Sequence, residues 1–136
     1  MAIGPEVDIL LRVLVAGALG YLVGIERESS GHEAGDRTFG LVCMASALFT
    51  ALGIEVFGQT STEAPSRIAQ NILTGVGFLG GGMILKEGLG VRGLTTAAGI
   101  WAIAAVGMSV GAGRYLVGVV VAGLIQIGRA SCRERV

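Results

Sequence analysis

The sequence predicts an all-α fold, a polytopic bundle of about five transmembrane helices packed tightly through glycine and alanine faces. Hydrophobic residues make up 52% of the 136 residues and charged residues only 15%, too little charge to cover a soluble domain of this size. The charges gather at the edges of five apolar stretches, most of them close to the roughly 17 to 25 residues that a helix needs to cross a bilayer. One stretch also contains a glycine-rich segment, residues 75–82.

Each apolar stretch is expected to form one helix. The first holds Asp8 and Arg12, which lie one helical turn apart and are expected to pair with each other. It is too long for the apolar core of a signal peptide, so we interpret it as a retained helix. The second carries Glu55 near its end, and the last is too short to cross a bilayer as it stands. In chain order the stretches are 7–25, 39–57, 68–85, 94–111 and 115–126.

The last ten residues depart from this pattern. Three arginines and a glutamate replace the apolar residues that the last helix still needs, and the decapeptide corresponds to one reading frame of a common sequencing adapter. We expect residues 1–126 to be the transmembrane domain, with its last helix truncated, and residues 127–136 to be adapter read-through. Without this segment the chain has seven basic and nine acidic residues, a net charge of about −2, which leaves no basic surface for nucleic acid.

Basic residues predict the orientation of the helices. Loops on the cytoplasmic side of a membrane carry an excess of lysine and arginine. The loops after the first and third stretches hold four such residues, and the loops after the second and fourth hold two. The first pair of loops is therefore expected in the cytoplasm; its basic residues are Arg27, Arg37, Lys86 and Arg92, against Arg67 and Arg114 on the other side.

Small residues predict how the helices pack, because they allow helix backbones to approach closely in lipid. GxxxG pairs occur at Gly20/Gly24, Gly77/Gly81 and Gly107/Gly111, and we expect them to join helices of this chain. A homodimer formed through one pair is the alternative. Replacing Gly77 or Gly81 by leucine is accordingly expected to disrupt folding. The glycines expected at helix contacts are Gly20, Gly24, Gly75, Gly77, Gly80 and Gly81.

Polar residues border the loop between the first two stretches. Glu26 and Arg27 close the first stretch, and Asp36, Arg37 and Thr38 open the second. One interpretation is that the acids and the threonine cap helix ends while the arginines extend to the membrane surface. The other is a functional polar cluster on the cytoplasmic face.

Two further groups of polar residues are candidates for function. Arg67, Gln70 and Asn71 share one face of the third stretch, where polar groups usually face a cavity or another helix. Arg92, Thr95 and Thr96 lie at the start of the fourth stretch, where either threonine can cap the helix.

No residue pattern indicates an enzyme, a cofactor or a metal site. The string GxGxxG at residues 75–80 lies inside an apolar stretch, without the strand that the dinucleotide fingerprint requires. The lone histidine lies in a loop without a nucleophile placed to use it.

Together these stretches resemble the MgtC/SapB family of bacterial inner-membrane proteins over about residues 10–126. The chain departs from the family pattern at Asp36, where an apolar residue is usual, and at Phe39, where a histidine is usual. The resemblance rests on residues 24–28, 34–38, 65–70, 75–82 and 92–98.

The resemblance implies a multi-pass inner-membrane protein without enzymatic activity. It implies a regulatory role in adaptation to low magnesium and in survival inside host cells, exerted on other membrane proteins such as the ATP synthase. Membrane lipid and these proteins are the expected partners. The alternative is a transporter of Mg²⁺ or another ion. We consider it weaker because Mg²⁺ requires oxygen ligands, and the acidic residues lie near the ends of the apolar stretches.

Overall fold

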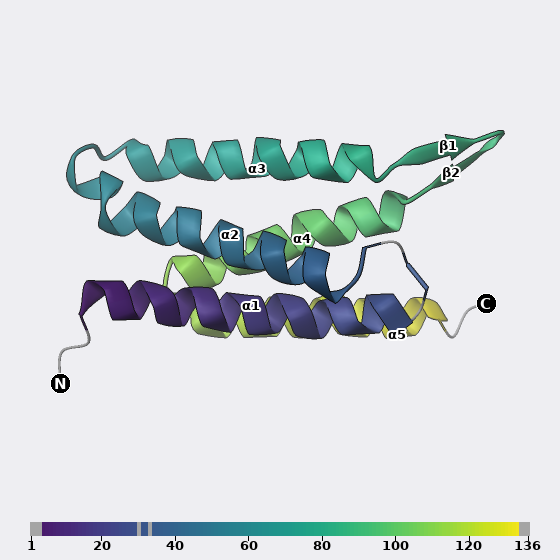
Figure 1. The fold of residues 1–136 in the computed structure, drawn as a ribbon, viewed down its shortest axis with the longest axis horizontal. Helices are drawn as coiled ribbons and strands as arrows, with labels where there is room; N and C mark the ends of the chain where they lie inside the picture. The colour runs from purple at the N-terminus through teal and green to yellow at the C-terminus, as the bar shows by residue number, and fades with distance from the viewer. Residues whose placement is uncertain (1–3, 30, 33, 134–136) are drawn as a thin grey trace.

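The protein is a bundle of antiparallel helices with a small β-hairpin at one end (Figure 1). The computed structural model describes residues 4–29, 31–32 and 34–133, with the backbone alone for residues 129–133. Within these residues the helices are α1 (Pro5–Ser29), α2 (Asp36–Glu55), α3 (Ala64–Gly82), α4 (Leu94–Gly111) and α5 (Tyr115–Arg133). A 3-10 turn, η1 (Phe57–Gln59), follows α2, and the hairpin of β1 (Leu85–Glu87) and β2 (Gly90–Arg92) joins α3 to α4. The predicted all-α fold is confirmed.

Helix α4 lies at the centre of the bundle, where it contacts each of the other four helices. Its sequence is apolar on all sides, which is typical of a helix buried on all sides. Ile100, Ile103 and Val106 are among its fully buried side chains. Helix α2 packs against α1 and α4 and also contacts α3, whereas α5 packs against α4 and α1. The core is therefore built mainly from α2 and α4.

Three of the helices in the described part of the chain are long and apolar enough to cross a membrane. They are α1, α4 and the segment Asp36–Gln59, which includes α2. The apolar part of α5, Tyr115–Gly128, is shorter. Many large apolar side chains of the bundle are exposed, among them Leu14, Phe78 and Leu116. An exposed apolar surface of this extent is typical of a protein that lies in lipid, and the chain is a membrane protein.

Close approach of the backbones occurs at two of the three GxxxG pairs. A Cβ atom on Gly20 would lie 2.6 Å from the carbonyl oxygen of Phe39, and one on Gly24 would overlap the backbone of Asp36. Gly107 and Gly111 likewise meet the backbone of α2. Since a real Cβ atom does not fit at such distances, the glycines allow both α1 and α4 to pack directly against the backbone of α2.

The third pair does not join helices of this chain. Among the described residues no other atom lies within 4 Å of a Cβ built on Gly75, Gly77 or Gly81, and all three are exposed. The prediction that Gly77 and Gly81 hold this bundle together is therefore wrong. Gly80 is buried on the side of α3 that meets α4, and a Cβ built on it would lie 3.6 Å from Ala97.

Helix boundaries also differ from the predicted ones. The third apolar stretch was expected to continue to Leu85, but α3 ends at Gly82 because three consecutive glycines, Gly80–Gly82, favour the helix poorly. The chain then forms the hairpin, which the sequence did not predict. Helix α5 continues past Gln126 to Arg133, without the break expected there. The origin of residues 127–136 stays a prediction.

Candidate functional site

Most candidate residues lie at one end of the bundle, which we call the hairpin end. Here the C-terminus of α1, the N-termini of α2 and α4, and the hairpin come together (Figure 1). The candidates that the structure places there are Glu26, Arg27, Asp36, Arg37, Thr38, Arg92, Thr95 and Thr96. The loop between α1 and α2 is short, so the polar residues at the end of α1 lie near those at the start of α2.

Arg27 links three helices at the hairpin end. Its side chain is almost completely buried, with 4% of the residue exposed. Its Nη2 donates a hydrogen bond to the carbonyl oxygen of Thr95, at 3.1 Å, in the first turn of α4. Its guanidinium carbon lies 6.0 Å from the centre of the Phe39 ring on α2. Arg27 therefore joins α1, α2 and α4, and it does not extend to the membrane surface.

The threonines of α4 do not cap it. The N-cap is Gly93, whose φ of +84° places it in the left-handed region, and no described side chain caps this helix end. A Cβ atom on Gly93 would also overlap the carbonyl group of Met83. Thr96 is buried, whereas Thr95, whose carbonyl oxygen accepts the hydrogen bond from Arg27, is exposed. The capping role expected for these two threonines is therefore wrong.

The cap of α2 also differs from the expected one. Its N-cap is Gly35, and no described side chain caps this helix end. The Asp36 carboxylate instead accepts a hydrogen bond from the backbone N–H of Arg37, at 2.6 Å. The side chains of Arg37 and Thr38 are exposed. These two residues are therefore available on the surface of the hairpin end.

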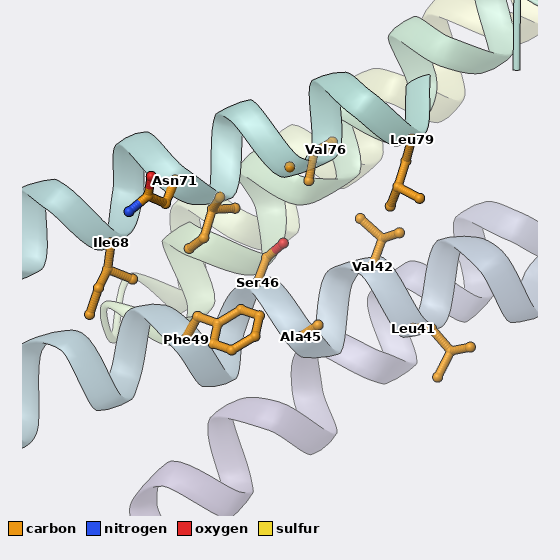
Figure 2. Close-up of a pocket in the computed structure, with 11 residues that line it drawn as sticks. Leu41, Val42, Ala45, Ser46, Phe49, Ile68, Asn71, Val76 and Leu79 are labelled. Carbon is orange, nitrogen blue, oxygen red and sulfur yellow. The ribbon is translucent and has the colours of Figure 1, made fainter. Parts of the chain in front are cut away.

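The polar residues of α3 form a separate group. Arg67 lies near the other end of the bundle and pairs with Glu63 of the same helix at 3.0 Å, with both side chains exposed. Gln70 is also exposed and points away from the core. Asn71 lies beside a groove of about 560 Å³ between α2 and α3, whose lining is otherwise apolar except for Ser46 (Figure 2). The structure does not bring these three residues to the hairpin end.

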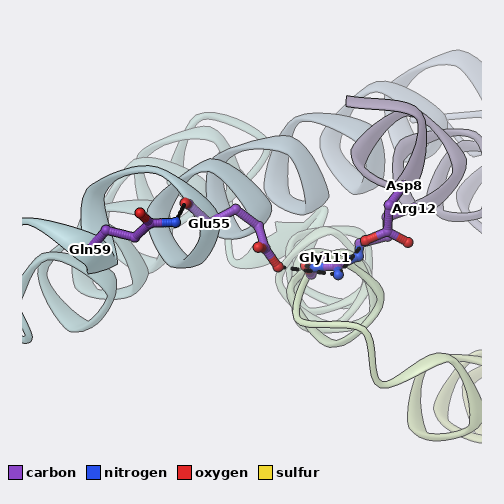
Figure 3. A network of polar contacts seen from close by, with 5 residues as sticks. All are labelled: Asp8, Arg12, Glu55, Gln59 and Gly111. Atoms are coloured by element: carbon purple, nitrogen blue, oxygen red, sulfur yellow. Dashed lines mark hydrogen bonds and ion pairs between the residues drawn. The ribbon is translucent and has the colours of Figure 1, made fainter. Parts of the chain in front are cut away.

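A polar network at the opposite end was only partly predicted. Arg12 pairs with Asp8 at 2.5 Å, as expected, and also with Glu55 of α2 at 3.3 Å (Figure 3). Its Nη1 donates a hydrogen bond, at 2.9 Å, to the carbonyl oxygen of Gly111. Gly111 is the last residue of α4. A cation at this position is favourable because the C-terminal end of a helix is partially negative. The sequence hinted at the contact with Glu55 only through the position of this acidic residue, near the end of the second apolar stretch.

The arrangement does not resemble a catalytic or metal centre. In the described part of the chain no three His, Cys, Asp or Glu side chains come together in a way that could hold a metal ion. Among the side chains that the structure describes, the buried polar ones are Arg27, Ser46 and Thr96. What the hairpin end offers chemically is a buried cation, free helix N-termini and exposed arginines.

Comparison with known proteins identifies the family. The MgtC family model matches residues 13–134, nearly the whole chain. The chain belongs to the MgtC family. It is 42% identical over 106 residues to Protein MgtC of Salmonella typhimurium, covering 78% of this chain and 44% of that protein.

Two further relatives are similar to the chain. Protein SrpB of Synechococcus elongatus is 40% identical over 128 residues, covering 86% of this chain and 70% of that protein. The Putative magnesium transporter YhiD of Escherichia coli is 40% identical over 117 residues, covering 82% and 54%. The chain thus spans about half the length of several curated relatives that it matches. No solved structure matches the chain.

Proposed function

We propose that this chain is the transmembrane part of a non-enzymatic regulatory protein of the bacterial inner membrane. In this proposal it crosses the membrane several times and acts on other membrane proteins, such as the ATP synthase, during adaptation to low magnesium or survival inside host cells. Membership in the MgtC family supports the proposal. The observation that carries it is the position of the polar side chains, at the two ends of the bundle and on the outer face of α3.

The surface of the hairpin end suits contact with a partner protein. Arg37, Thr38 and Arg92 are exposed there, and Leu89 at the hairpin tip is fully exposed. The positive-inside bias favours a cytoplasmic location for this end. A partner with an acidic or polar cytoplasmic surface could therefore contact it without entering the bilayer.

Ion transport is the second candidate, and the name of the Escherichia coli relative, Putative magnesium transporter YhiD, favours it. Mg²⁺ is bound through oxygen ligands in octahedral geometry and loses its water reluctantly. A pathway for it requires polar groups deep in the bundle. The middle of this bundle instead holds mostly apolar side chains from α2 and α4, including Ala47, Ile103 and Val106, and Ser46 is the buried polar side chain of the described part of α2. This composition supports regulation over transport.

Two assays distinguish the candidates. The first measures Mg²⁺ uptake into proteoliposomes that contain the folded chain. The second measures ATP-driven proton pumping by inverted bacterial membrane vesicles with and without the chain. We expect no saturable uptake and a change in pumping that Arg37→Ala weakens. Saturable Mg²⁺ uptake, lost when Glu26 or Gln70 is replaced, would establish transport and refute the proposal.

A further inference from the structure

The groove between α2 and α3 opens on the apolar outer surface of the bundle. Its volume is about 560 Å³, which is within the range of small-molecule sites. Its rim includes three apolar side chains that are each more than half exposed, those of Leu41, Phe49 and Leu79. No charged side chain of the described residues lines it. A molecule that fits this groove is therefore apolar over most of its surface and carries no charge.

One buried hydroxyl group points into the groove without a hydrogen-bond partner. Ser46 is 2% exposed, and its Oγ points from α2 toward α3 (Figure 2). Hydroxyl groups inside helices often donate to the carbonyl oxygen four residues earlier, as Thr74 and Ser109 do, at 3.0 and 2.9 Å. The Ser46 hydroxyl makes no hydrogen bond with any described residue. Since hydrocarbon supplies no water, this buried donor costs free energy unless another molecule provides an acceptor.

A second polar side chain lines the groove about one helical turn from Ser46. A Cβ atom on Gly53 of α2 would lie 3.0 Å from the Ile68 side chain of α3. Because the two helices run antiparallel (Figure 1), Ser46 lies opposite Gly75, and Asn71 is four residues, or about 6 Å, further along. The NH₂ group of the Asn71 carboxamide is a donor, and no described residue bonds to it. The groove thus presents two unpaired donors in an apolar lining.

Gly75 leaves space opposite the Ser46 hydroxyl. It lines the groove, and no described atom outside its own helix lies within 4 Å of a Cβ built on it. The missing side chain therefore keeps the groove open at the level of the buried donor. A large residue here would fill the groove without meeting the backbone of α2.

We propose that this groove binds a membrane-soluble quinone, whose carbonyl oxygens accept hydrogen bonds from Ser46 and Asn71. A quinone is neutral and carries two carbonyl acceptors on one flat ring, and its apolar tail suits the rest of the lining. An acyl chain alone would fill the groove but leave both donors unpaired. The ester carbonyls of phospholipids lie at the membrane surface, whereas Ser46 is near the middle of the membrane-spanning segment Asp36–Gln59. This inference concerns binding alone and does not depend on the proposed function.

Methyl NMR of the chain in phosphatidylcholine nanodiscs tests the site. Isoleucine methyl groups are labelled with ¹³C and decylubiquinone is titrated; decylbenzene, an apolar molecule without a carbonyl group, is the control ligand. We expect saturable shifts of the methyl resonances of Ile68 and Ile72, which line the groove, and no shift for Ile103 in the core. Decylbenzene should bind about tenfold more weakly, because it leaves both donors unpaired.

Variants test the residues. Ser46→Ala and Asn71→Leu should each weaken decylubiquinone binding about fivefold, the effect of one hydrogen bond. Thr50→Val is the matched control and should leave the affinity unchanged, because the Thr50 hydroxyl is also buried without a partner but does not line the groove. Gly75→Leu should abolish binding by filling the groove. Gly77→Leu adds the same side chain to an exposed position of α3 outside the groove, so it should have no effect.

Three results would overturn the inference. The first is the absence of saturable shifts at Ile68 and Ile72 in the folded wild-type chain. The second is equal binding of decylbenzene, or unchanged affinity in folded Ser46→Ala, because either shows that no carbonyl group is recognised. The third is a shift of the same methyl resonances, without quinone, that grows with the number of chains per nanodisc. That result would assign the groove to a second copy of the chain.

Discussion

Adding one methyl group at Gly107 is expected to destabilise the bundle strongly. The Cβ atom of Gly107→Ala would overlap the carbonyl group of Cys43 and lie 3.0 Å from the Ser46 Cβ. The carbonyl belongs to the α2 backbone, so relief requires the whole helix to move and not one side chain to rotate. Overpacking of a core costs about 1–3 kcal/mol, and displacement of two central helices places this variant at the upper end of that range.

Gly77→Ala is the matched control. It adds the same methyl group to a helical glycine, but no described atom outside its own helix lies within 4 Å of the new Cβ. Alanine favours a helix over glycine by about 0.5–1 kcal/mol, so this variant should be neutral or slightly stabilising. The two variants are therefore expected to differ by about 3 kcal/mol or more in the free energy of unfolding.

Unfolding in mild detergent, titrated with a denaturing detergent and followed by circular dichroism, measures this difference. The midpoint should fall for Gly107→Ala and stay or rise for Gly77→Ala. Equal midpoints would refute the packing argument. Loss of stability in Gly77→Ala alone would restore the sequence-based prediction that the third GxxxG pair holds the bundle together.

The same unfolding assay tests two further predictions. Arg12→Gln should lower the free energy of unfolding by about 1–3 kcal/mol, because it removes the partner of the Gly111 carbonyl and of two carboxylates. Arg67→Gln, which changes an exposed ion pair, should lower it by about 0.5 kcal/mol or less. Equal losses in the two variants would contradict this. Gly93→Ala should unfold or misfold the hairpin end because of its positive φ and its contact with Met83, and a wild-type spectrum would refute the geometry. Arg37→Ala should fold normally, as judged by the same midpoint, but weaken effects on partner proteins; loss of expression would indicate a structural role instead.

Helix existence could be predicted from the sequence because apolar length and the position of charges are local properties. They identify α1, α2 and α4 directly, and the end of α4 at Gly111 agrees with the predicted boundary. The end of α3 could not be placed in the same way. Hydropathy continues to Leu85, but the weak helix propensity of Gly80–Gly82 ends the helix earlier. The apolar composition predicts that a segment lies in lipid. The helix propensity of its residues determines where the helix ends.

Packing and the candidate site were less predictable because they depend on which face of a helix meets a neighbour. The pairs Gly77/Gly81 and Gly107/Gly111 have the same spacing, yet one faces outward and the other meets α2. One of the two interpretations of the sequence has Arg27 extend to the membrane surface, as terminal arginines often do. Its burial depends on Phe39 and Thr95, which are distant in sequence. Only the assembled bundle shows these contacts.

The two arginines of α1 also limit how the bundle can move. Arg12 and Arg27 are separated by about 22 Å along α1, and their partners Gly111 and Thr95 by about 24 Å along the antiparallel α4. A slide of one helix past the other by a single turn would break both contacts at once. Helices α1 and α4 are thus fixed in register at both ends. A conformational change that keeps both contacts would tilt or rotate α1 and α4 together while other helices, such as α3, move relative to that pair.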